Sequence, residues 1–193
     1  MGIGSLCRFV WSGDYSTLCR QARSGRYVVQ GDPGTADCVL GFAFGRLGEE
    51  PNIQPGISNE ELARFARKHF PNLPAILQQE VADVYELLTP APVLRVDRHR
   101  QEDKYLDTRE VADQARLLMG QRGWQVALLL AHGYHVPRAL RICTRLGLCT
   151  VVPAGLEEIP FCTDSSQSWT RSAGAWYRRE RLVLLHHAWK DWL

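Results

Sequence analysis

Short apolar runs alternate along this chain with segments that have the apolar spacing of amphipathic helices, and this alternation constrains the fold most. The predicted strands are residues 36–44, 73–77, 93–96, 126–131 and 149–152. The predicted helices are residues 58–69, 80–88, 107–121 and 134–146, with a long final helix after residue 172. Because strands joined through a helix pair in parallel, we expect an α/β fold of the Rossmann-like, doubly wound type. Such a fold is a mainly parallel sheet with helices on both faces.

Residues 1–35 do not share this alternation. Gly, Ser and Arg are spread through them around one β-like run at residues 26–30, and a turn signal at residues 31–34 closes the segment. We therefore expect an irregular N-terminal extension that packs on one α/β domain, residues 36–193. A chain of 193 residues fits one domain with an appendage.

Composition excludes several classes of protein. The net charge is only +2 and Arg is scattered, whereas a nucleic-acid interface is usually more basic and more clustered. The most apolar run, residues 126–131, is far shorter than the roughly 20 residues of a membrane-spanning helix, and no signal peptide is apparent at the N-terminus. The six cysteines form no CxxC pair and no zinc-finger spacing. We expect a cytoplasmic protein with no nucleic-acid partner, no membrane attachment and no metal.

The segment from Leu130 to Arg138 is the sharpest candidate site, because a buried strand runs there into a helix. Ligands of such sheets bind outside the carboxyl ends of the strands. The helix N-terminus and Arg138 favour an anion, and His135 could donate, accept or transfer a proton. His132 lies in the same turn, but no third metal ligand is adjacent. The same spacing also fits a helix cap at His135 and an ion pair at Arg138.

Two other strand-to-helix junctions face the same crevice. Asp107, Thr108 and Glu110 open one helix, although Asp107 and Glu110 also fit a capping box, as Ser58 and Glu61 do at an earlier helix. Gln79 and Glu80 follow the second strand, and Glu80 is a candidate second acid/base or a solvated first-turn acid.

The loop of residues 163–171 carries hydroxyls, an amide, an arginine and Trp169, which suits a lid over a heterocyclic ligand as well as an ordinary surface loop. The first strand is not followed by GxGxxG, and neither GxxxxGK[ST] nor GxSxG occurs. Ordinary Rossmann dehydrogenases, P-loop enzymes and α/β-hydrolases are therefore disfavoured.

Three motifs follow one another along about residues 36–155. They are an Asp-led strand ending in Gly41, Glu102 with Asp107, Thr108 and Glu110, and His132-Gly-Tyr-His135-Val-Pro-Arg138-Ala139. Together they resemble the YdcF/SanA/ElyC family of bacterial α/β proteins. The resemblance implies a ligand site at these residues and, for the soluble YdcF-like branch, S-adenosylmethionine as ligand. It implies no established reaction.

The chain departs from that family's pattern at three places. Gln78-Gln79-Glu80 stands where the family has Ser-Gly-Gly, Val111 replaces an Asn, and Tyr105 replaces a Ser. The first departure removes a glycine-rich approach to the ligand. From the three departures together we expect a divergent branch with its own ligand.

Two classes of function remain open. The first is a small-molecule enzyme or ligand-binding protein for an anionic or nucleoside-containing ligand, with His135 as the proton-transfer candidate. The second is a non-catalytic, partner-binding or homodimeric protein that uses the final helix, in which Trp176, Trp189 and Trp192 could form an exposed stripe. Core packing is the alternative role for those tryptophans.

Overall fold

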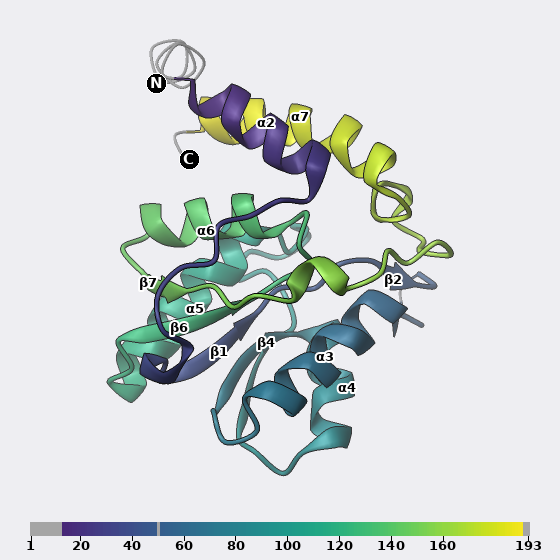
Figure 1. Cartoon of the computed structure of the whole chain (residues 1–193). Coiled ribbons are helices and arrows are strands. Elements are labelled where there is room, and N and C mark those ends of the chain that lie inside the picture. Colours follow the sequence, from purple (N-terminus) through teal and green to yellow (C-terminus); the bar gives the residue numbers. More distant parts are fainter. Residues whose placement is uncertain (1–12, 50, 191–193) are drawn as a thin grey trace.

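A five-stranded parallel sheet forms the centre of the molecule in the computed structural model, which describes residues 13–49 and 51–190 (Figure 1). The strands are β1 (Cys38–Gly41), β4 (Ala75–Gln78), β5 (Val93–Val96), β6 (Val126–Leu130) and β7 (Cys149–Val151). Their order across the sheet is β5-β4-β1-β6-β7. Because β4 and β6 lie on opposite sides of β1, the strand order reverses there, and the carboxyl end of β1 becomes the expected place for a ligand.

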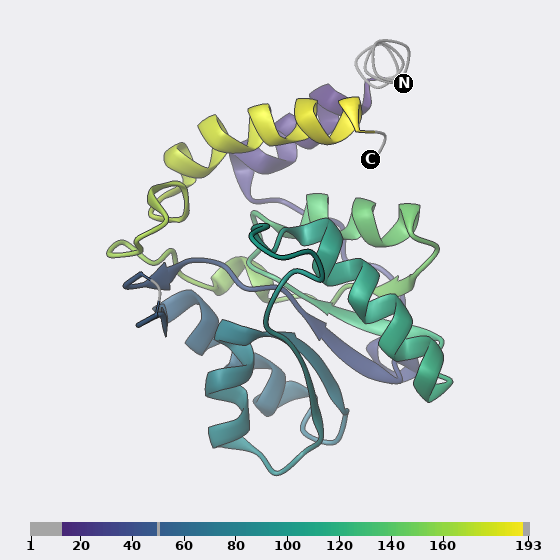
Figure 2. The same ribbon diagram turned by 180° about the vertical axis from the view of Figure 1, so that it is seen from behind.

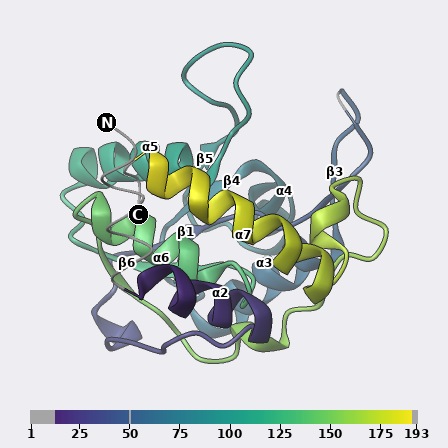
Figure 3. The ribbon, with the colours of Figure 1, turned by 90° about the horizontal axis from the view of Figure 1, so that it is seen from above.

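Helices cover both faces of the sheet, which confirms the predicted doubly wound α/β fold. Viewed from above, α3 (Ile57–His69) and α4 (Gln79–Leu88) lie on one side, and α5 (Thr108–Arg122) and α6 (Val136–Arg145) lie on the other (Figure 3). The two layers can also be followed from behind (Figure 2). The central strands are buried on both faces, so they are apolar along their whole length rather than at alternate positions.

Five shorter elements complete the fold outside the central sheet and its helices. A small antiparallel pair, β2 (Arg46–Leu47) with β3 (Gln54–Pro55), lies between β1 and α3. Three single 3-10 turns are η1 (Pro33–Thr35), η2 (Leu156–Glu158) and η3 (Ser168–Thr170).

The helix starts agree only in part with the predicted capping boxes. Asp107 caps α5, since its Oδ1 accepts from the Glu110 N–H at 2.9 Å. The prediction for α3 is wrong: Gly56 is the N-cap residue there, and the Ser58 hydroxyl donates instead to the Pro160 carbonyl at 2.6 Å. The Ser58 hydroxyl is therefore bound by the segment that follows β7. The spacing of residues around Ser58 does not indicate this long-range contact.

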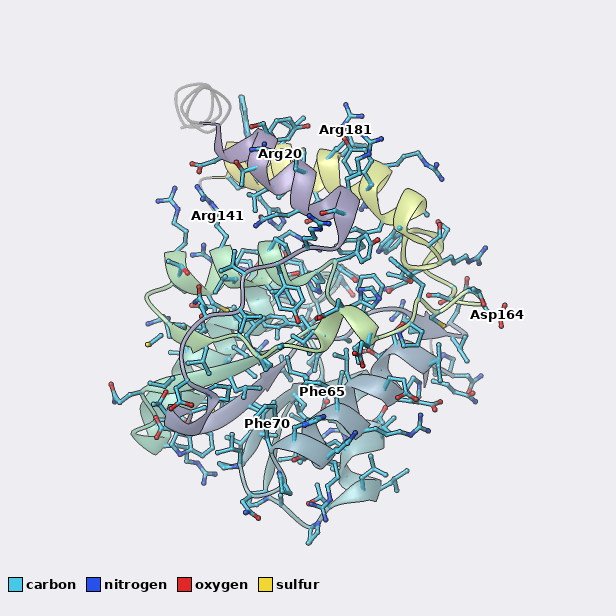
Figure 4. The ribbon with its side chains drawn as sticks, viewed as in Figure 1. Arg20, Phe65, Phe70, Arg141, Asp164 and Arg181 are labelled. Atoms are coloured by element: carbon cyan, nitrogen blue, oxygen red, sulfur yellow. The ribbon has the colours of Figure 1, made fainter. Side chains whose placement is uncertain are left out.

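The N-terminal region differs from the irregular extension that we predicted, because helix α2 (Asp14–Ser24) forms there. Apolar residues at the spacing i, i+3, i+4, i+7 carry this helix: Tyr15, Leu18, Cys19 and Ala22. Figure 1 shows α2 running beside α7 (Ala173–Trp189), the final helix. Arg141 of α6 also reaches toward α2, where its guanidinium donates to Asp14 Oδ2 at 2.8 Å (Figure 4).

Helix α7 crosses over the carboxyl edge of the sheet rather than covering a face of it (Figure 3). Its burial is uneven, since Trp176 and Leu184 are buried whereas Leu182 and Trp189 are exposed. None of the helices in the described ranges is long and apolar enough to cross a membrane. The position of α7 makes it the roof of the space above β1, β4 and β6.

Candidate functional site

A cavity of about 480 Å³ lies at the carboxyl edge of the sheet, beneath α7. Its floor comes from the loop that follows β1, from the last residue of β4 and from the first turns of α5 and α6. Its other wall comes from η3, the loop before it, and α7. The volume is within the range of small-molecule sites, and the position is the topological switch point of the sheet.

Thr108 links two elements of the cavity floor through its buried hydroxyl. The His135 Nε2 atom lies 3.0 Å from Thr108 Oγ1, and the Arg138 Nη1 atom donates to the same oxygen at 2.9 Å. Thr108 is the first residue of α5, whereas His135 and Arg138 belong to the start of α6. The hydroxyl therefore fixes the orientation of both side chains toward the cavity.

Arg138 is also held by the roof of the cavity. Its Nε donates to Glu180 Oε1 at 2.8 Å, and its guanidinium carbon lies 5.4 Å from the ring centroid of Trp176. Burial raises the pKa of Glu180, and Arg138 opposes that shift. The ion pair foreseen as an alternative role for Arg138 is thus formed, with a partner that the sequence did not indicate. The guanidinium charge is compensated within the protein.

His135 occupies the N-cap position of α6 but makes no capping hydrogen bond with its side chain. Burial lowers its pKa well below the usual value, and the Arg138 charge lowers it further, so the imidazole is neutral. The N–H groups of His135 and Val136 both donate to the His132 carbonyl, at 2.6 and 3.1 Å, and Pro137 has no N–H. The α6 N-terminus therefore has fewer donors left for an anion than we expected.

The loop after β1 is fixed from two sides. The Phe44 N–H donates to Asn59 Oδ1 at 2.8 Å, and Asn59 Nδ2 donates to the Gly45 carbonyl. The Ala43 N–H donates to Gln78 Oε1 at 3.0 Å. Gly45 has φ of +77°, and a Cβ there would lie 2.9 Å from Thr170 Oγ1, so the loop needs a glycine at this place.

Five of the predicted site residues line the cavity: Asp107, Thr108, His135, Arg138 and Trp169. Trp169 comes from the predicted lid loop, whose Asp164 points away from the molecule (Figure 4). Gln167 of the same loop donates through Nε2 to the Tyr105 hydroxyl at 3.2 Å, and both residues line the cavity. The three junctions predicted to face one crevice therefore contribute unequally, and the junction after β4 gives only Gln78.

The other five predicted site residues do not line the cavity: Gly41, Gln79, Glu80, Glu110 and His132. A Cβ on Gly41 would lie 2.5 Å from Leu77 Cδ2, so this glycine serves the packing of the sheet. The His132 ring stacks on Phe44 with a centroid distance of 3.9 Å, and burial lowers its pKa to about 3. His132 therefore packs against Phe44, a residue of the cavity lining, without lining the cavity itself.

Two of the three predicted acidic residues, Glu110 and Glu80, do not line the cavity and are engaged or buried elsewhere. The Glu110 carboxylate accepts from the Arg100 guanidinium at 2.7 Å and from the Arg100 N–H at 3.1 Å. Burial raises the pKa of Glu110, but these hydrogen bonds outweigh it and hold the pKa at about 2. Glu80 is buried at the start of α4, where burial raises its pKa.

Sequence reasoning missed Glu180, Phe44 and Asn59. Glu180 follows Trp176 by one helical turn, and a lone carboxylate on the buried side of a Trp-bearing helix is the signal that could have shown it. Across the described residues, we find no group of three or more His, Cys, Asp or Glu side chains placed to hold a metal ion.

The fold and the cavity define a Rossmann-like α/β protein with a cavity at the switch point of its sheet. No family model, no curated protein and no solved structure matches the chain. The resemblance to YdcF-like proteins therefore stays a prediction from the sequence motifs.

Proposed function

We propose that this protein binds a small, nucleoside-containing ligand in the cavity beneath α7. The supporting observation is a set of buried polar atoms, in residues that line the cavity, that have no hydrogen-bond partner among the described residues. They are Glu180 Oε2, His135 Nδ1 and Trp176 Nε1. A buried polar atom without a partner is costly, and native proteins keep such atoms mainly where water or a ligand completes them.

The chemistry of the wall favours a nucleoside over a simple anion. Trp169 and Trp176 supply aromatic surface for a planar base, each with an arginine near its ring. Glu180 Oε2 is an acceptor suited to a sugar hydroxyl, the role that acidic residues have in dinucleotide-binding sheets. A simple anion would interact with neither the aromatic surface nor the Glu180 carboxylate. The charge of Arg138, which could bind an anion, is already compensated by Glu180.

S-adenosylmethionine has the groups that this wall can hold: a heterocycle, a ribose and a cationic sulfonium. The tryptophans suit the heterocycle and the cation, and Glu180 suits the ribose hydroxyls. When bound, this ligand would supply a transferable methyl group. The residues of this chain would bind it, orient it and keep water out.

If the ligand reacts, His135 is the group in place to exchange a proton. Its imidazole is neutral and oriented by Thr108, and its Nδ1 atom is unpartnered within the described structure. A neutral imidazole can accept a proton, which a charged one cannot. Glu80 does not line the cavity, so we do not propose it as a second acid/base.

The exposed stripe on α7 has weaker support. Trp176 is buried against Phe44 and His135, so it belongs to the cavity wall. Trp189 and Leu182 are exposed, and Trp192 lies outside the described residues. Since the stripe would rest on two residues, we do not advance partner binding as a second function.

Calorimetric titration of the full chain with adenosine and with S-adenosylmethionine tests the proposal. We expect at least one of them to bind, and we expect Glu180→Gln and His135→Asn each to weaken that binding about tenfold, the usual effect of losing one good hydrogen bond. Glu158→Gln, which changes an exposed carboxylate away from the cavity, is the matched control. Absence of binding for both ligands, or equal affinity in all variants, would show that the site is wrongly assigned.

A further inference from the structure

A second concavity adjoins the cavity on its outer side. It also has a volume of about 480 Å³, and it shares Tyr105, Asp107 and His186 with the cavity. It lies between the start of α5, the loop before it, and the C-terminal end of α7. A ligand that fills the cavity could therefore extend directly into this space.

Basic residues dominate the lining of this concavity. Lys104, Arg109 and Lys190 contribute three side chains that are charged at neutral pH. Within residues 13–49 and 51–190, neither Lys104 nor Lys190 takes part in an ion pair. Both lysines are exposed, so their ammonium groups stay hydrated until a ligand arrives.

The two carboxylates in the same lining are engaged already. Asp107 accepts from the Glu110 N–H as the cap of α5. Glu110 is bound by Arg100 and also accepts from Gln114 Nε2 at 2.9 Å. Because Arg100 neutralises the charge of Glu110, the lining of this concavity carries a net positive charge. The net charge of the whole chain is only +2 and does not indicate this local excess.

We propose that this concavity binds the phosphate groups of a nucleotide whose nucleoside part occupies the cavity. The inference rests on the proposed function and adds the ligand class to it. Arg138, to which the sequence assigned the anion, is paired with Glu180. Lys104 and Lys190, which form no ion pair within the described residues, lie instead in the adjoining concavity, where a 5′-substituent that leaves the cavity would pass. Lysine ammonium groups act on phosphate as point charges and need no fixed bidentate geometry.

The test compares adenosine, adenosine 5′-monophosphate, adenosine 5′-diphosphate and pyrophosphate as probes in calorimetric titrations of the full chain at low salt. We expect the monophosphate to bind about tenfold more tightly than adenosine, and the diphosphate more tightly again. In the double variant Lys104→Gln/Lys190→Gln this gain should disappear while the affinity for adenosine stays the same. Lys68→Gln, on the exposed surface of α3, is the charge-matched control for each substitution.

The four probes separate the two proposals. Adenosine binding with no gain from phosphate overturns the phosphate site and leaves the nucleoside site in place. Pyrophosphate binding that is lost in the double variant supports the phosphate site, even if adenosine fails to bind and the nucleoside site is wrong. Pyrophosphate or nucleotide binding that is unchanged in the double variant overturns the assignment to Lys104 and Lys190.

Discussion

Arg138 Nε donates to Glu180 Oε1 at 2.8 Å and so joins the first turn of α6 to the middle of α7 across the cavity. Both side chains are nearly buried, with 11% of the Arg138 side chain and 2% of the Glu180 side chain exposed. The pair is therefore a connection between the floor and the roof of the site. It makes the geometry of the cavity depend on the docking of α7.

Removing one member of this pair should destabilise the protein strongly. Arg138→Met leaves the Glu180 carboxylate buried without its partner, and we expect a loss of about 3–5 kcal/mol in the free energy of unfolding. Replacing both residues, Arg138→Met with Glu180→Leu, should restore most of that loss because no buried charge remains. Urea unfolding of the wild type, both single variants and the double variant measures the coupling. A single Arg138→Met variant as stable as the wild type would contradict the buried pair.

The Thr108 hydroxyl should matter more than the volume of its side chain. Thr108→Val leaves the partners at Arg138 and His135 without their shared oxygen, and we expect a loss of about 1–3 kcal/mol in unfolding free energy. Thr108→Ser keeps the hydroxyl and should lose clearly less. Thermal unfolding followed by circular dichroism distinguishes the two variants, and equal losses would indicate that packing of the methyl group is the main contribution.

Gly41 should prove to be a packing residue. Gly41→Ala places a Cβ 2.5 Å from Leu77 Cδ2 in the buried sheet, and overpacking of this kind costs about 1–3 kcal/mol. Gly120→Ala is a matched control, because nothing lies within 4 Å of its Cβ position on the exposed side of α5. The control should be neutral or more stable by up to about 1 kcal/mol. Denaturant unfolding compares them, and a neutral Gly41→Ala would contradict the close approach of Leu77.

Acidification should destabilise the fold below neutral pH through its buried histidines. Burial lowers the pKa values of His132 and His187 to about 3, whereas an unfolded histidine titrates near 6.5. The unfolded state therefore binds more protons, and stability is fully present above pH ~6.5 and is lost as pH falls from there toward pH ~3.

Each such histidine should contribute a slope of up to about 1.4 kcal/mol per pH unit in that window. His132→Gln removes one titrating group, and its unfolding free energy should vary less with pH than that of the wild type. Chemical unfolding at pH 7, 6 and 5 measures both slopes. Parallel slopes would mean that His132 is not held neutral in the folded state.

Local sequence patterns determined the layers of this protein. Apolar runs with helical spacing between them predicted each strand of the sheet. The signal is clearest in central strands such as β6, because burial on two faces selects apolar residues without interruption. The same order brought Thr108 near His135, since the carboxyl ends of parallel strands meet at one edge of the sheet. The sequence of α2 also has the apolar spacing of a helix. Most residues of this segment are polar, so the spacing was not recognised as a helix.

Only the tertiary structure decided which of the candidate residues share a site. Glu180 meets Arg138 across 42 residues of sequence, and Asn59 holds the β1 loop from α3. Local periodicity fixes which face of a helix is buried, but it does not fix the partner of that face. The partner follows from how α7 docks over the sheet edge, and that docking depends on side-chain shape and charge summed over contacts distant in sequence.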